Sequence, residues 1–109
     1  MESIKGKALA LKELVAYGDD AVISRTLLKK ESGNLTLFSF ARGQGLSEHT
    51  SPFDAVVYVV EGRGSFIIDG EAVTVAEGEM IIMPANIPHD VQAADEPFKM
   101  LLIMIRSET

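Results

Sequence analysis

The two histidines of the chain, His49 and His89, are the side chains best suited to carry chemistry. Each lies in a strand-forming stretch framed by glycine, residues 43–62 and residues 78–93. A neutral imidazole is a good ligand for first-row divalent metals, and imidazole in general titrates near neutrality, so it can also act as an acid or base. The chain has no cysteine, which excludes thiolate nucleophiles, disulfides and cysteine-ligated zinc.

The spacing of residues within these two stretches resembles the two motifs of the cupin superfamily. The first stretch reads Gly43, five residues, His49, one residue, Ser51 and then PFDAVVYVVEG. The second stretch reads Gly78, five residues, Pro84, one residue, Asn86, two residues and His89. The resemblance implies a small β-barrel with an internal metal pocket, whose usual ligands are two His and a Glu from the first motif and one His from the second.

Matching the chain to that pattern residue by residue implies an incomplete ligand set. His49 and His89 fall on ligand positions. Ser51 stands where a second His would be, and Ala55 stands where the Glu would be. Two imidazoles alone bind a divalent ion weakly, because tight protein sites supply three or four side chains. The ion that the resemblance implies is Zn, Fe, Mn or Ni.

Asp54 is the only carboxylate beside the missing Glu position. Regular strand alternation points its side chain away from Ala55 and out of the barrel. A bulge beginning at Pro52 would shift that alternation by one residue, and Asp54 could then be a third metal ligand or a partner that fixes a His tautomer. His49 and His89 are therefore the predicted metal donors, with Asp54 as a further candidate.

The chain is expected to fold as one small all-β domain behind a short arm. From residue 22 onward, β-rich runs alternate with turn residues, and the resemblance makes the expected fold an antiparallel jelly-roll β-barrel. The expected strands are residues 22–28, 35–41, 47–49, 55–60, 64–68, 71–75, 80–83, 89–93 and 99–105. Residues 1–21 are expected to form an N-terminal arm, partly irregular or with a short helical turn within residues 8–16, and residues 22–109 are expected to form the barrel. Asp69-Gly70 predicts a two-residue hairpin turn.

Composition limits the partners of this domain. A formal net charge of −6 argues against nucleic acid, because basic residues must neutralise phosphates and here they are outnumbered. No apolar run approaches the ~20 residues that cross a bilayer, and the first residues lack a signal-peptide pattern. We therefore expect a cytoplasmic protein with no membrane partner.

Strand alternation in a closed barrel predicts which side chains line its interior. His49 and Ser51 should share the inward face with Ser47 and Gly45, and His89 should begin a second inward row. Apolar residues complete the predicted cavity, so the predicted ligand-pocket residues are His49, Ser51, His89, Ser47, Phe38, Phe40, Met83 and Met100, with Met104 as another flexible filler. Such a cavity would take a small, partly apolar ligand.

Two functions stay open from the residues alone. The first is a small-molecule-binding barrel without turnover, in which His49 and His89 are among the few polar groups of an apolar pocket. The second is a metal-dependent enzyme of the dioxygenase, isomerase or decarboxylase type, which the resemblance implies and which would need Asp54 or water to complete the metal site. Either protein could be a homodimer, because exposed sheet edges such as LTLFSF need covering.

Overall fold

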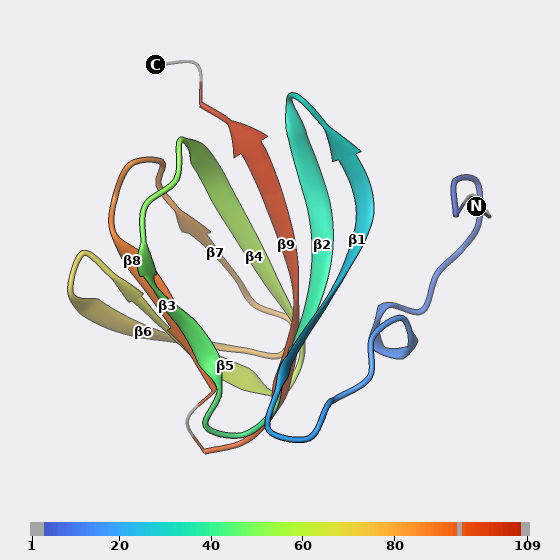
Figure 1. Cartoon of the computed structure of the whole chain (residues 1–109), viewed down its shortest axis with the longest axis horizontal. Helices are drawn as coiled ribbons and strands as arrows, with labels where there is room; N and C mark the ends of the chain where they lie inside the picture. Colours follow the sequence, from blue (N-terminus) through green and yellow to red (C-terminus); the bar gives the residue numbers. More distant parts are fainter. Residues whose placement is uncertain (1–3, 94, 108–109) are drawn as a thin grey trace.

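Two antiparallel sheets face each other in the part of the chain that the computed structural model describes, residues 4–93 and 95–107 (Figure 1). The larger sheet has the strand order β1-β2-β9-β4-β7, with β1 Val22–Lys30, β2 Gly33–Phe40, β9 Phe98–Arg106, β4 Phe53–Glu61 and β7 Met80–Met83. The smaller sheet has the order β3-β8-β5-β6, with β3 Gly45–His49, β8 His89–Gln92, β5 Arg63–Ile68 and β6 Glu71–Ala76. The prediction of a small antiparallel all-β barrel is confirmed.

The turns between strands follow from local sequence. Ile68 pairs with Glu71, so Asp69 and Gly70 form a two-residue turn with φ angles of 50° and 85°. Positive φ at both turn residues is the type I′ geometry that the Asp-Gly pair predicts. Every observed strand lies within two residues of its expected ends, because the turn residues mark the boundaries.

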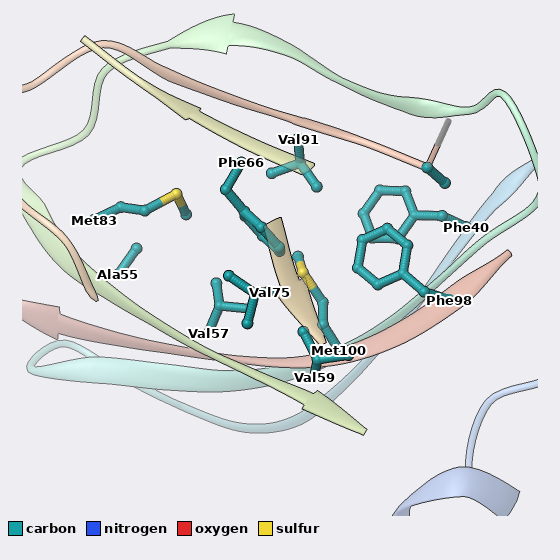
Figure 2. Packing of buried hydrophobic residues seen from close by; sticks show 11 residues of the cluster. Phe40, Ala55, Val57, Val59, Phe66, Val75, Met83, Val91, Phe98 and Met100 are labelled. Carbon is teal, nitrogen blue, oxygen red and sulfur yellow. The ribbon is translucent and has the colours of Figure 1, made fainter. Parts of the chain in front are cut away.

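The core fills the space between the two sheets. Along β4 the side chains of Ala55, Val57 and Val59 are buried, and the residues between them are more exposed. From the opposite sheet, Phe66 and Val91 pack against this row. Figure 2 shows Met83 and Ala55 at one end of this cluster and the rings of Phe40 and Phe98 at the other. The end that holds Met83 stays less filled, and the site described below lies there.

The arm packs on the outer face of the larger sheet. Residues 4–21 contain one turn of 3-10 helix, Leu11–Glu13, which lies within the segment 8–16 where a short helical turn is one of the two expectations. Val15 is buried in a second apolar cluster with Leu37 and Val60, which lie on the outward faces of β2 and β4. Residues 4–21 therefore cover part of the outer face of the sheet, and none of them lines the cavity described below.

Tyr17 attaches the arm to the sheet by polar contacts. Its hydroxyl donates a hydrogen bond of 2.6 Å to Glu61 Oε2, and the Lys99 ammonium lies 4.9 Å from its ring centroid. Partial burial, the hydrogen bond to Glu61 and the negative charges of Glu61 and Glu96 raise the pKa of Tyr17 above its ordinary value. The folded protein thus favours the neutral phenol.

Another part of the outer surface is apolar. Tyr58, Met80 and Ile82 on β4 and β7 are exposed. β7 is an edge strand of its sheet. Homodimer formation stays a prediction.

No helix in the described part of the chain has the length and apolarity needed to span a bilayer.

Gly64→Ala is expected to destabilise the protein by about 1–3 kcal/mol. A Cβ at this buried strand position would lie 2.5 Å from Cζ of Phe98, and that ring is held by stacking on Phe40 at 4.7 Å. Urea unfolding followed by circular dichroism measures the loss. In a Phe98→Leu background the same substitution should cost clearly less, since the ring end is gone. An equal cost in both backgrounds would contradict the close-approach explanation.

Raising the pH through the range where an unfolded tyrosine ionises, at about 10, should lower the stability of the natural protein more than that of Tyr17→Phe. The unfolded chain releases the phenol proton there and the folded chain retains it, so this contribution is complete at lower pH and declines as the pH rises. Urea midpoints at pH 8 and pH 10.5 for both proteins test the difference. Identical declines in the two proteins would show that the contact with Glu61 does not raise the pKa of the Tyr17 phenol.

Candidate functional site

A small cavity between the sheets brings the two histidines together. Its volume is about 40 Å³, and it is lined by Leu46, His49, Ala55, Met83, His89, Val91, Met100, Leu102 and Met104. Apart from the two imidazoles, every side chain in this lining is apolar or a thioether. A space of this size holds a water molecule or a few atoms, and larger ligands require the flexible methionines to move.

The two imidazoles face each other across a pair of strands. His49 on β3 and His89 on β8 are register partners, and their ring centroids are 4.5 Å apart with a 68° angle between the ring planes. His89 is buried, with 4% of its surface exposed, whereas His49 is exposed. The pair therefore extends from the cavity interior to its opening.

Both rings make the same hydrogen bond. Nδ1 of His49 lies 2.8 Å from the Ser47 carbonyl oxygen, and Nδ1 of His89 lies 3.0 Å from the Ile87 carbonyl oxygen. A carbonyl oxygen can only accept, so in each neutral ring the proton sits on Nδ1 and the lone pair on Nε2. Within the described residues neither Nε2 has a hydrogen-bond partner. The arrangement leaves two adjacent acceptors for a ligand.

A hydrogen-bonded turn presents His89. Asn86 has a φ of 65°, the left-handed geometry expected of it, and its N–H donates to the Ser51 carbonyl at 2.8 Å. The N–H of Ala85 donates to Asp54 Oδ1 at 2.9 Å. These two hydrogen bonds connect the stretch that carries His49 to the turn before His89, and they fix the position at which β8 begins.

The predicted inward row of β3 is wrong in part. A register irregularity between Leu46 and His49 interrupts the alternation, so the side chains of Leu46 and His49 both line the cavity. Ser47 is exposed and supplies its backbone carbonyl to His49, and Gly45 is outside the lining. One extra residue in a strand reverses the facing of those beyond it, which strict alternation cannot anticipate.

Two other predicted polar residues hold loops instead of lining the cavity. The Ser51 hydroxyl accepts from the N–H of Phe53 at 3.0 Å in the turn before β4. Asp54 keeps the regular outward facing of β4, because Ala55 lines the cavity and no bulge begins at Pro52. Its carboxylate receives the Ala85 N–H, so its position is that of a turn-stabilising acceptor.

The predicted apolar residues divide into two groups. Met83 and Met100 line the cavity, and Figure 2 shows both sulfur atoms turned into the space between the sheets. Phe40 is fully buried but stacks on Phe98 at the other end of the core, and Phe38 stacks on Phe40 at 5.8 Å. Both rings stay outside the lining, because the barrel is filled there.

Sequence reasoning missed two lining residues, Leu46 and Leu102. The other residues of the wall agree with expectation: Val91 follows His89 on its inward row, Ala55 faces inward on β4, and Met104 is a flexible filler of the cavity. Their shared signal is parity: Met100, Leu102 and Met104 alternate along β9, and Val91 follows His89 by two. Leu46 is the exception among the lining residues, because the register irregularity in β3 breaks the alternation of inward-facing side chains.

The donors present do not fit the ligand set that the resemblance implies for a divalent metal. Among the residues described, no group of three or more His, Cys, Asp and Glu side chains could hold a metal ion. Ala55 occupies the expected carboxylate position, and the carboxylate of Asp54 is directed to the neighbouring turn. A divalent ion would have two imidazoles and no anionic ligand here.

Comparison with known proteins agrees with this architecture. A family model described as a cupin domain matches residues 36–104. A conserved protein of unknown function from Streptococcus pyogenes is 39% identical with a TM-score of 0.90, over 99% of this chain and 95% of that one. A cupin 2 conserved barrel domain protein from Leptotrichia buccalis is 41% identical with a TM-score of 0.86, over 87% of this chain and 46% of that one.

One curated enzyme shares part of the sequence. Acireductone dioxygenase of Gluconobacter oxydans is 40% identical over 60 residues, which are 51% of this chain and 32% of that enzyme. This chain therefore spans about a third of the dioxygenase that it matches.

Both histidines are expected to show the tautomer with Nδ1 protonated and Nε2 free. Long-range ¹H–¹⁵N spectra of the folded protein at pH 8.5 should give one protonated and one unprotonated nitrogen per ring, because each backbone carbonyl requires a donor. The urea-unfolded chain is the control, since its imidazoles lose these carbonyl partners. A folded spectrum with the proton on Nε2 of either ring would contradict the arrangement.

Proposed function

The chain belongs to the cupin family, and on that premise we propose that it binds a small molecule at the His49–His89 pair without needing a divalent metal. The observation that carries the proposal is the double Nδ1 hydrogen bond to backbone carbonyls, which leaves both Nε2 atoms as acceptors at one end of an apolar cavity. A ligand whose donor reaches these acceptors while its apolar part enters the cavity gains both a hydrogen bond and apolar burial.

The chemistry of the pair selects the ligand. Two neutral imidazoles that offer only lone pairs complement a hydroxyl or another hydrogen-bond donor and reject a group that can only accept. The rest of the lining favours an apolar body beside that donor. A small phenol or alcohol therefore fits this site better than a sugar phosphate or a carboxylate.

The opening of the cavity suits entry from solvent. His49 is exposed while His89 is buried, so a ligand can meet the outer ring first and place its apolar part between the methionine side chains. Methionine is unbranched and adapts its shape easily, which lets a cavity of about 40 Å³ enlarge around a small ring.

The alternative is a metal-dependent dioxygenase, isomerase or decarboxylase that uses His49 and His89. The 60-residue similarity to acireductone dioxygenase supports it. The missing third ligand weighs against it, because an open catalytic site on a divalent ion conventionally has two His and one carboxylate. Site chemistry, not the shared fold, decides between such functions, and here it favours binding.

Phenol is expected to bind about tenfold more tightly than its methyl ether, anisole, because only phenol can donate to Nε2. Titrations followed by the methyl signals of Met83 and Met104 measure both affinities. His89→Leu should remove the preference for phenol. Ser47→Ala is the matched control and should retain it, because Ser47 stands beside the pair in sequence and outside the cavity.

Equal binding of phenol and anisole by the natural protein would overturn the proposal, and so would the absence of binding by both. Loss of the preference in Ser47→Ala as strongly as in His89→Leu would show that the discrimination arises elsewhere.

A further inference from the structure

The wall opposite the imidazoles carries thioether sulfur. On β4, Ala55 pairs with Met83 of β7 on one side and with Met104 of β9 on the other. Register partners point to the same face of a sheet, and all three side chains line the cavity. Ala55 is therefore the small centre of a row whose two flanking residues are methionines.

This row lies where the family resemblance places a carboxylate ligand. Ala55 aligns with the Glu position, so the anionic donor is absent and two neutral sulfur donors stand beside the vacated place. Met100 lines the same cavity and adds a third thioether (Figure 2). The set of donors is softer than the set implied by the resemblance, in which imidazoles act with a carboxylate.

We propose that the cavity is a binding site for a soft monovalent metal ion, Cu(I), held between Nε2 of the two imidazoles and the thioether sulfur atoms of Met83 and Met104. The inference rests on the proposed function in one respect, that both imidazoles line the cavity with Nδ1 held by a backbone carbonyl and Nε2 left as the acceptor. It differs in the ligand, which is a cation.

Donor softness selects this ion. Thioethers suit Cu(I), imidazole suits copper and zinc, and harder ions such as Mg, Ca and Mn prefer oxygen. The lining offers two imidazole nitrogens and three thioethers, and it contains no side-chain oxygen. Zinc would find only its two imidazole ligands here, whereas Cu(I) could use both types of donor.

Charge selects the same ion. All the lining donors are neutral and their surroundings are apolar, so an ion entering the cavity keeps its full charge in a medium of low polarity. The Born cost of that transfer rises with the square of the charge, which disfavours a divalent ion relative to a monovalent one. Burial of His89 keeps solvent from the inner side of the site.

Nitrogen and sulfur arrive from opposite sheets. The imidazoles belong to β3 and β8 of the smaller sheet, while Met83 and Met104 belong to β7 and β9 of the larger one. A bound ion would therefore connect the two sheets at the less filled end of the barrel. The alternative is that the methionines only fill space, and isosteric substitutions separate the two roles.

The test is anaerobic titration of the full chain with Cu(I) in competition with bicinchoninate, a chromogenic Cu(I) chelator, alongside zinc titration with a fluorescent zinc indicator. We expect one Cu(I) per chain and an affinity for zinc that is lower than the affinity for Cu(I) by at least about a hundredfold. X-ray absorption at the copper edge should require both nitrogen and sulfur neighbours. Since the chain has no cysteine, any such sulfur must come from methionine.

Met83→Leu and Met104→Leu should each weaken Cu(I) binding about tenfold or more, because leucine keeps similar volume and removes the sulfur. Met80→Leu is the matched control: Met80 lies on the same strand as Met83 with its side chain exposed at the outer face, so binding should be unchanged. Circular dichroism of each variant establishes that the fold is retained.

The proposal is overturned if copper shows no sulfur neighbour, if zinc binds as tightly as Cu(I), or if Met80→Leu weakens binding as much as Met83→Leu. Failure of Cu(I) binding in a protein that still prefers phenol over anisole would reject the metal site and leave the small-molecule function standing. If the protein shows neither Cu(I) binding nor a preference for phenol, both proposals are rejected and the two histidines have only a structural role.

Discussion

The hydrogen bond from each imidazole Nδ1 to the carbonyl two residues before it is the constraint on which the site depends. It fixes the ring tautomer by the same means at His49 and His89, because a carbonyl accepts and cannot donate. It also holds each ring against its own backbone, so the paired strands β3 and β8 set the distance between the rings. The two free acceptors result from backbone geometry and require no third side chain.

The cavity beside these acceptors has its two kinds of donor on different walls. The imidazoles lie on the wall of the smaller sheet together with Leu46 and Val91, and the three methionines lie on the wall of the larger sheet. The aromatic stack of Phe40 on Phe98 fills the opposite end of the barrel and confines the free space to the histidine end. Asp54, the carboxylate nearest in sequence to the expected ligand position, is used to hold the turn before His89. The structure thus positions both imidazoles at the cavity through backbone hydrogen bonds and a turn held by Asp54, with no carboxylate among the described residues of the lining.

Much of the fold could be predicted from local signals, because each acts over a few residues. The Asp69-Gly70 pair fixed its hairpin through two positive φ angles, and the alternation of buried Ala55, Val57 and Val59 marked the inward face of β4. Asn86 has left-handed geometry, which asparagine tolerates better than most residues. The site was predicted less well. His49, His89, Met83 and Met100 meet at the cavity, but Ser47, Ser51, Asp54, Phe38 and Phe40 do not line it.

What the sequence determined by itself was the family, the strand positions and the identity of the two imidazoles, since these depend on residue types and on spacing along the chain. Tertiary structure alone decided which side chains share the cavity. The irregularity after Leu46 arises from how β3 pairs with β8, and the meeting of Met83 with Met104 beside Ala55 arises from strands that are adjacent in the sheet and distant in sequence. Pairing between remote strands sets both, because backbone hydrogen bonds across a sheet fix register and register fixes the facing of every side chain.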